Sequence, residues 1–153
     1  MGKIKFYKDV TKVELPFILI QEGTFKGVVM LIDTGSNNNI VWGYAFEQLK
    51  DKFMPLEGSS SLFGLEGTVK ESNLVKGTFS FCGKEYDMTF LVREDDEAAV
   101  RIANEIGIPM AGIIGTNFMA EHNWTIDYAK QEIRIPKGDM SIGLFAAIRR
   151  KLQ

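Results

Sequence analysis

The fold of this chain is decided by the stretch VVMLIDTGS at residues 28–36. Its first five residues are apolar, and a continuous apolar run of this length is typical of a strand buried on both faces. The strand runs directly into Asp33, so we expect this carboxylate at the rim of the core. Thr34 supplies a hydroxyl that can bond a neighbouring loop, and Gly35 permits a positive φ or a close backbone approach. Ser36 can orient the carboxylate through a hydrogen bond.

The tripeptide Asp-Thr-Gly is, by itself, also an ordinary turn at the end of a strand. At usual frequencies of about 5–7% for each residue type, it occurs by chance in roughly one chain of this length in a few tens. The apolar strand before it, and the segments that follow it, therefore decide whether the tripeptide marks a site.

The composition limits the chemistry that this chain can perform. Its 153 residues include 18 Lys and Arg against 20 Asp and Glu, so the formal net charge is −2 and the basic excess of a nucleic-acid-binding domain is absent. A single cysteine, Cys82, excludes an intrachain disulfide and a thiolate metal cluster. The single histidine, His122, lies at a predicted helix end, where a capping or surface role is favoured. Carboxylates and hydroxyls remain as the reactive groups, and we expect no metal and no cofactor.

Local patterns predict a chain of strands with a few short helices. Strands are predicted at 13–20, 26–32, 40–42, 68–75, 77–82 and 85–92, with a later hairpin at 124–128 and 132–135. Helices are predicted at 43–53, 95–106, 116–121 and 141–152. No repeat and no linker divides the sequence, so we expect one domain over residues 1–153.

In these surroundings, the segment Leu31-Ile32-Asp33-Thr34-Gly35-Ser36 resembles the active-site motif of aspartic proteases, and it best resembles the single-lobed retropepsin-like group. Residues 61–68, SLFGLEGT, are similar to the flap hairpin of that family. Residues 111–119, AGIIGTNFM, resemble its second conserved segment, and residues 124–128, WTIDY, resemble the strand that follows it. The resemblance covers about residues 13–136.

The resemblance implies an acid-protease fold, a closed β-barrel, and an aspartic endopeptidase that acts on polypeptides. In that family two carboxylates share one proton and activate a water molecule between them. This chain has one Asp-Thr-Gly, and Asp127, in the only later comparable strand, is not followed by Thr-Gly. We interpret Asp127 as structural. The resemblance therefore implies a homodimer in which Asp33 of each chain supplies one carboxylate.

The resemblance also implies roles for the neighbours of Asp33. Thr34 would join the two loops across the two-fold axis, Gly35 would let the loop bend, and Ser36 would orient the carboxylate. Two further groups are implied, a flap that covers the substrate and a cleft wall behind the loop: Gly64, Leu65, Glu66 and Gly67 for the flap, and Ile113 and Ile114 for the wall.

Two departures from the family pattern favour a rival hypothesis. Residues 37–39 are all asparagine, which is unusually polar for a segment beside a substrate cleft, and Glu66 puts a charge near the flap tip. The rival is a non-catalytic peptide-binding or dimerisation module on the same scaffold. A monomeric β-barrel without an active site is a third possibility.

The sequence shows no targeting or membrane segment. The first five residues, MGKIK, lack the apolar part of a signal peptide, so we expect a cytoplasmic protein. The longest apolar run, residues 28–32, is too short to span a bilayer. We therefore expect neither a membrane nor a nucleic acid as a partner.

Overall fold

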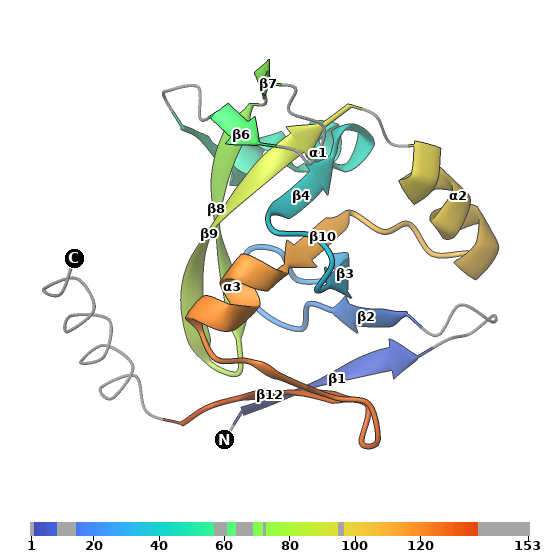
Figure 1. Cartoon of the computed structure of the whole chain (residues 1–153), viewed down its shortest axis with the longest axis vertical. Helices are drawn as coiled ribbons and strands as arrows, with labels where there is room; N and C mark the ends of the chain where they lie inside the picture. The colour runs from blue at the N-terminus through green and yellow to red at the C-terminus, as the bar shows by residue number, and fades with distance from the viewer. Residues whose placement is uncertain are drawn as a thin grey trace, which may run out of the picture.

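Strands are the main element of the structure, a computed structural model that describes residues 2–8, 15–56, 61–63, 69–71, 73–94 and 97–137 (Figure 1). Ten strands of the described chain form one sheet: β1 (Gly2–Lys8), β2 (Pro16–Leu19), β3 (Val29–Asp33), β4 (Asn39–Trp42), β5 (Met54–Pro55), β8 (Leu74–Phe81), β9 (Lys84–Arg93), β10 (Gly112–Gly115), β11 (Thr125–Asp127) and β12 (Glu132–Ile135). Two more strands pair separately: β6 (Ser61–Phe63) and β7 (Val69–Glu71). The helices are α1 (Gly43–Leu49) with the 3₁₀ turn η1 (Lys50–Lys52), α2 (Glu97–Ile106) and α3 (Thr116–Glu121). The prediction of a mostly β chain with a few short helices is confirmed.

The large sheet is open in the described residues. Its hydrogen-bonded order is β11-β12-β1-β2-β3-β10-β4-β9-β8-β5, so β11 and β5 are its two ends. The end strand β5 has two residues, and one of them is Pro55, which has no N–H to donate to a further strand. The predicted closed barrel is therefore not confirmed.

At the centre of the sheet, β10 lies between β3 and β4, although β3 and β4 follow one another in the chain. It is parallel to β3, with Gly115 opposite Asp33, and antiparallel to β4. Every residue of β4 and β10 is buried, as their mostly apolar sequences predict for strands covered on both faces. The loop from β3 to β4, which carries residues 34–38, therefore passes across the end of β10.

The two glycines that bound β10 are required by this insertion. A Cβ on Gly112 would clash with the carbonyl oxygen of Ile40 on β4. A Cβ on Gly115 would lie 2.5 Å from the carbonyl oxygen of Asn38 and 2.7 Å from that of Ser36. Because these neighbours are backbone atoms, they have no rotamer to change, and only glycine lets β10 approach them so closely.

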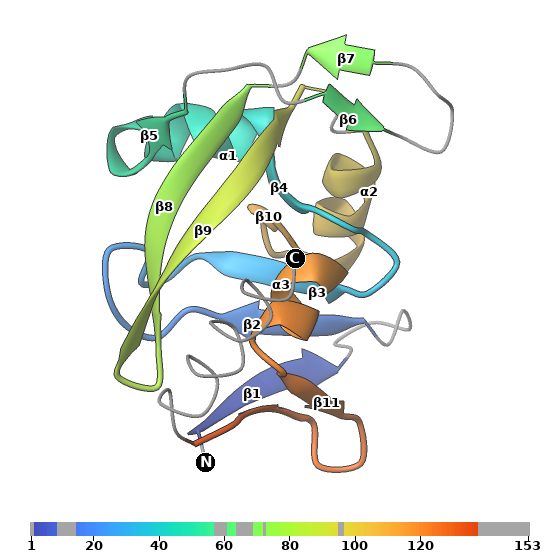
Figure 2. The same cartoon turned by 60° about the vertical axis from the view of Figure 1, so that its left-hand side comes forward.

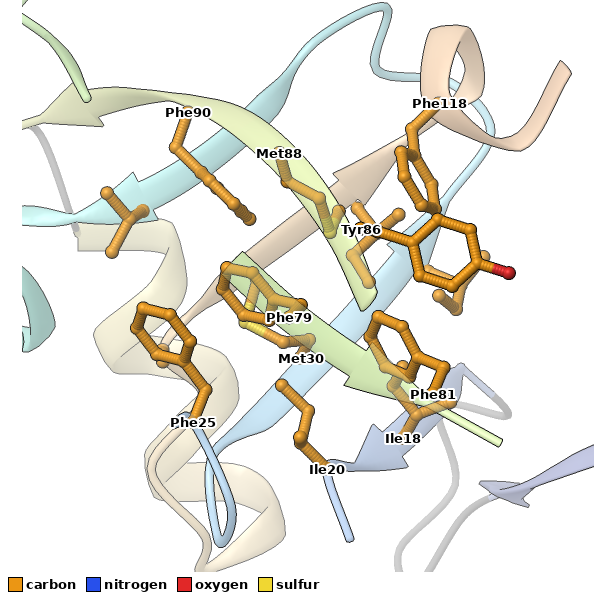
Figure 3. Close-up of a cluster of buried hydrophobic side chains, with 14 of the residues drawn as sticks. Ile18, Ile20, Phe25, Met30, Phe79, Phe81, Tyr86, Met88, Phe90 and Phe118 are labelled. Carbon is orange, nitrogen blue, oxygen red and sulfur yellow. The ribbon is translucent and has the colours of Figure 1, made fainter. Parts of the chain in front are cut away.

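Two apolar clusters lie on opposite faces of the central strands. Along β3, Met30 and Ile32 belong to the larger cluster and Leu31 to the smaller one, as the alternation of a strand requires. In the larger cluster the rings of Phe25 and Phe79 stack with their centroids 4.0 Å apart. Figure 3 shows how its side chains converge from several strands and from α3: Ile18, Ile20, Phe25, Met30, Phe79, Phe81, Tyr86, Met88, Phe90 and Phe118. The smaller cluster contains Phe17, Leu31, Ile40, Trp42, Leu91, Ala99, Met110 and Ile113.

Most predicted elements agree with the structure to within a few residues. The helix predicted at 116–121 is α3, and the one predicted at 43–53 is α1 with η1. The turn between β8 and β9 is formed by Cys82 and Gly83, both at positive φ (54° and 76°), which is the backbone shape that suits a two-residue hairpin. The strand β1 was not predicted, although alternating Lys3, Ile4 and Lys5 carry a period-two pattern.

Some predictions fall on parts of the chain outside the described residues. These are the C-terminal helix at 141–152, the start of the helix predicted at 95–106, and the four flap residues Gly64, Leu65, Glu66 and Gly67. The strands β6 and β7 on either side of residues 64–68 are described, and they pair antiparallel with Phe63 opposite Val69. This pair lies at the opposite end of the molecule from β1 and β12 (Figures 1 and 2).

Candidate active site

Asp33 ends β3 at the point where the loop over β10 begins. Its side chain is half-buried, and its Oδ1 accepts a hydrogen bond of 2.9 Å from the backbone N–H of Gly35. Its carbonyl oxygen accepts the backbone N–H of Ser36 at 3.1 Å. The two bonds form a tight turn that fixes both the main chain and one carboxylate oxygen of Asp33.

The rest of the loop is tied to the start of α3. The first backbone N–H groups of a helix have no partner within the helix, and here the loop supplies their acceptors. The N–H of Thr116 donates to the carbonyl of Ser36 at 2.7 Å, and the N–H of Asn117 donates to the carbonyl of Asn37 at 3.2 Å. The loop and α3 therefore support one another. The Ser36 hydroxyl donates to the carbonyl of Asn38 at 2.8 Å, so its role in orienting the carboxylate stays a prediction.

Asn39 links β10 to β9 behind the Asp33 loop, a role that was not predicted from the sequence. It is 9% exposed, its Oδ1 accepts the N–H of Gly115 at 2.9 Å, and its Nδ2 donates to the carbonyl of Thr89 at 3.1 Å. One amide thus satisfies a donor on β10 and an acceptor on β9. The available signal was weak: an amide residue directly before the apolar run at 40–42, at what proves to be the first position of the buried strand β4.

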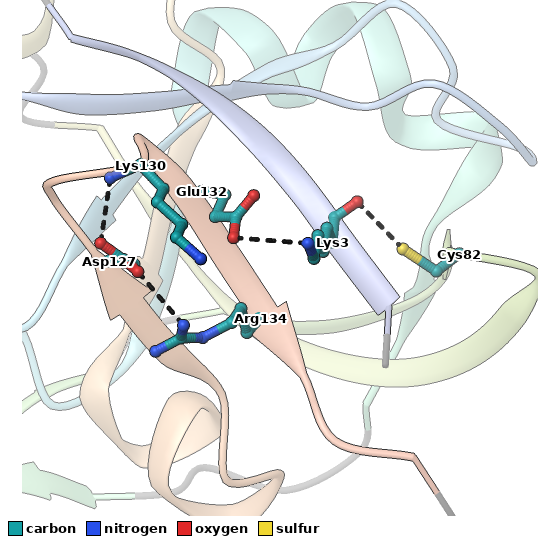
Figure 4. A network of polar contacts seen from close by, with 6 residues as sticks. All are labelled: Lys3, Cys82, Asp127, Lys130, Glu132 and Arg134. Carbon is teal, nitrogen blue, oxygen red and sulfur yellow. Dashed lines mark hydrogen bonds and ion pairs between the residues drawn. The ribbon is translucent and has the colours of Figure 1, made fainter.

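The later aspartate, Asp127, has a different environment, at the end of β11. Its Oδ1 accepts the N–H of Lys130 at 3.0 Å, and its Oδ2 lies 3.2 Å from Nη1 of Arg134 (Figure 4). The hydrogen bond from Lys130, followed by the charge of Arg134, lowers the pKa of Asp127. Both partners stabilise the β11–β12 hairpin, which supports the structural interpretation of this residue. Asp33, in contrast, has no ion-pair partner among the described residues.

The residues predicted for the cleft wall lie on β10, directly behind the Asp33 loop. Ile114 is fully buried in the larger cluster, and Ile113 is 8% exposed in the smaller one. Since β10 pairs with β3 in register, both positions brace the strand that carries Asp33. Contact of either with a substrate stays a prediction.

An open hollow of about 530 Å³ lies beside the loop. It is lined by the exposed Thr34 together with residues of α3 and the segment after it: Thr116, Met119, Ala120, Asn123, Trp124, Thr125 and Ile126. It adjoins β11, an end strand of the sheet, so both the hollow and the strand edge face outward. His122 follows the last residue of α3, and its backbone N–H donates to the carbonyl of Phe118 at 3.1 Å, which agrees with a capping role. The centroid of its ring lies 4.5 Å from that of Phe118.

Two classes of site are not found in the part of the chain that the structure describes. No three His, Cys, Asp or Glu side chains gather there as the ligands of a metal ion would. None of the helices there combines the length and the apolar character needed to cross a membrane.

Comparison with known proteins identifies the fold. No protein-family model matches the sequence, and no curated protein matches it. Among solved structures, a retropepsin-like aspartic protease from Rickettsia conorii is similar with a TM-score of 0.50 at 13% identity, over 86% of this chain and 88% of that one. The retroviral protease-like domain of Ddi1 from Leishmania major has a TM-score of 0.49 at 19% identity, over 85% of this chain and 92% of that one. The Rickettsia structure shows that this chain has a retropepsin-like fold, which confirms the resemblance at the level of the fold.

Proposed function

We propose that the chain is an aspartic endopeptidase that works as a homodimer and hydrolyses peptide bonds in polypeptides. One observation carries the proposal: in a chain with a retropepsin-like fold, Asp33 is held in a tight turn by the N–H of Gly35 and has no ion-pair partner among the described residues. A carboxylate that is positioned but not neutralised is available for proton transfer.

The reaction needs two such groups. One ionised carboxylate takes a proton from water while the other, protonated, donates a hydrogen bond to the peptide carbonyl. The water oxygen bonds to the carbonyl carbon, the C–N bond then breaks, and the leaving amine takes a proton from the pair. Two adjacent carboxylates share one proton because both cannot be ionised at close range, as is known for aspartic proteases. With one Asp33 in each chain, the pair forms on a two-fold axis.

The hollow beside Thr34 supports the placement of that axis. A second copy that brings its Asp33 to this one must cover the exposed Thr34 and the surface of α3 and β11 that adjoins it. The proposal includes residues 1–153 as one domain and the assignments implied by the resemblance: Thr34 across the axis, Gly35 and Ser36 in the loop, Gly64, Leu65, Glu66 and Gly67 as the flap, and Ile113 and Ile114 as the wall.

A mixed-dimer experiment tests the proposal. Wild-type chains are co-expressed with increasing amounts of the Asp33→Asn chain, and cleavage of a peptide library is measured at constant total protein. If each active pair needs two Asp33 carboxylates, an equal mixture keeps about a quarter of the wild-type activity, whereas independent chains keep about half. Peptides that bind between about pH 4 and pH 7 without any cleavage would favour the non-catalytic module instead.

A charge on the proposed dimer face gives a separate test. Ala120→Glu places a carboxylate on the exposed surface of α3, which a two-fold axis would set against its own copy. We expect a monomer by light scattering and a loss of cleavage that high protein concentration partly restores. Gln48→Glu, at an exposed position of α1, is the matched control and should stay dimeric and active. A dimeric, active Ala120→Glu chain would show that the interface lies elsewhere.

A further inference from the structure

A second hollow, of about 220 Å³, lies between β9 and α3 and reaches residues 37–39 of the Asp33 loop. The exposed side chains of Asp87 and Glu121 line it, and none of the described residues around it is a lysine or an arginine. Asp87 pairs with Lys76 at 3.5 Å and accepts the Thr78 hydroxyl at 2.9 Å. Glu121 has no ion-pair partner among the described residues. This acidic hollow therefore suits a basic partner.

The side chain of Tyr86 lies beside the acidic hollow and carries an unsatisfied hydroxyl. Tyr86 precedes Met88, which lines the hollow, by two residues, so the two side chains share one face of β9. Tyr86 is 4% exposed, and its buried hydroxyl has no hydrogen-bond partner among the described residues. Figure 3 shows this hydroxyl directed away from the apolar cluster. Because buried hydroxyls are nearly always hydrogen-bonded, we expect an acceptor on the outer side of this face.

The C-terminal residues 138–153 leave the described part of the chain close to this face. The last strand, β12, ends at Ile135, which lies opposite Gly2 of β1. A Cβ on Gly2 would lie 3.0 Å from the Cβ of Cys82 and 3.4 Å from that of Ile135. The chain therefore passes the turn between β8 and β9 as it leaves β12, and both views show the end of β12 below this turn (Figures 1 and 2).

The helix predicted at 141–152 has the length needed to reach the acidic hollow from there. A helix over these residues is about 18 Å long. Along β9, the path from Lys84 at the turn to Thr89 at the hollow is about 17 Å. Residues 138–140 remain to join the helix to β12. A helix that begins beside the turn and follows β9 therefore ends at the hollow.

The sequence of the predicted helix matches this path in polarity. Arg149 and Lys151 lie near its last turn, on the two sides of its apolar face. One of these cations would thus point to Asp87 on β9 and the other to Glu121 on α3. The apolar face consists of residues spaced three and four apart: Leu144, Phe145, Ile148 and Leu152.

We propose that residues 141–152 form a helix that docks between β9 and α3 of the same chain, with its basic end in the acidic hollow. The docked segment brings backbone carbonyl groups over the Tyr86 hydroxyl and closes the hollow against residues 37–39 of the Asp33 loop. The chain's own segment is the favoured occupant because its attachment at β12 keeps it at a high effective concentration beside this face. The inference holds whether or not the chain cleaves peptides.

Disulfide trapping in the full-length chain tests this placement. Every variant carries Cys82→Ser, so that no native thiol competes. Glu121→Cys is combined in turn with Arg149→Cys and with Lys151→Cys, and disulfide formation in oxidised glutathione is followed at low protein concentration. The matched control replaces Glu121→Cys by Glu105→Cys, at an exposed position of α2. At least one pair with Glu121→Cys should form a disulfide within one chain, about tenfold faster than its control.

Two further variants test the apolar face of the predicted helix. In the trapped pair, Phe145→Asp puts a carboxylate on that face, so disulfide formation should slow by about tenfold, to the rate of the control. Ala146→Asp lies on the opposite side of the helix and should keep the rate within about twofold. Disulfides that form as fast in the control, that join two chains, or that form equally fast with Phe145→Asp would overturn the inference. Since no readout requires cleavage, a failure of the proposed function would leave these results unchanged.

Discussion

Asp33 and Asp127 are held by the same kind of turn but differ in the charges around them. Each closes a strand, β3 or β11, and each accepts a backbone N–H from a residue further along the chain, at 2.9 Å and 3.0 Å. Asp127 has in addition the guanidinium of Arg134 at 3.2 Å, and its pKa is lowered. Asp33 has no cation beside it among the described residues. A turn positions the carboxylate of both residues. The carboxylate of Asp127 is paired with a cation and stabilises the hairpin, whereas that of Asp33 is left without such a partner.

The difference follows from the place of each strand in the sheet. β3 is central and pairs in parallel with the buried β10, so the residue opposite Asp33 is Gly115, which has no side chain to pair with the carboxylate. β11 is an end strand in an antiparallel hairpin, and its neighbour β12 brings Arg134 within reach of Asp127. The pairing that buries β3 on both faces thus also keeps charged side chains away from its end.

Exchanging each aspartate for asparagine gives the largest expected contrast. Asp33→Asn removes the group that transfers the proton, so cleavage should fall by about 10²- to 10⁴-fold, or below detection, while the dimer and the melting temperature stay close to wild type. Asp127→Asn should keep wild-type cleavage at temperatures where it is folded. Peptide cleavage and light scattering on both variants check this. An Asp33→Asn chain that cleaves as well as the parent would refute the proposed mechanism.

The support behind Asp33 should be the next most sensitive feature. Gly115→Ala drives a Cβ to within 2.5 Å of the Asn38 carbonyl oxygen and 2.7 Å of that of Ser36. We expect a loss of about 3 kcal/mol or more in the free energy of unfolding, because the clash is with backbone. Gly43→Ala is the control, since its Cβ would be nearest to the end of the flexible Glu94 side chain. Urea denaturation measures the free energy of unfolding of both variants. A loss in Gly115→Ala as small as that in Gly43→Ala would show that the loop moves to accommodate the Cβ.

Removal of the Asn39 amide should have a somewhat smaller effect. Asn39→Ala leaves the N–H of Gly115 and the carbonyl of Thr89 without their buried partner, which costs about 2–3 kcal/mol of unfolding free energy. Asn104→Ala, at an exposed position of α2, should leave stability almost unchanged. Hydrogen exchange at the Gly115 amide gives a local readout, which should be faster in Asn39→Ala alone.

These features differ in how far the sequence reveals them. The Asp33 loop, β10 and α3 are predictable because local signals define them: an apolar run, glycines at both ends of residues 112–115, and a threonine where α3 begins. The bridge made by Asn39 is not predictable locally, because its acceptor on Thr89 is 50 residues away in the chain. The insertion of β10 between β3 and β4, and the packing of α2 against the smaller cluster, likewise depend on tertiary packing.

The smallest effect, and the one that sharpens the comparison of the two aspartates, is the pH dependence of stability at Asp127. Its pKa in the folded chain lies below the ordinary value of 3.8, so the folded state favours the charged form. The resulting stabilisation is fully present above about pH 4 and is lost as the pH falls through the folded pKa. The melting temperature of the wild type should therefore exceed that of Asp127→Asn at neutral pH, and the two should converge on acidification. Arg134→Met keeps the hydrogen bond from the Lys130 N–H, which is the larger cause of the lowered pKa. Its melting temperature at neutral pH should therefore lie between those of the wild type and Asp127→Asn. Thermal melts between about pH 2 and pH 7 measure the three curves, and parallel curves for the wild type and Asp127→Asn would show that this carboxylate does not stabilise the hairpin.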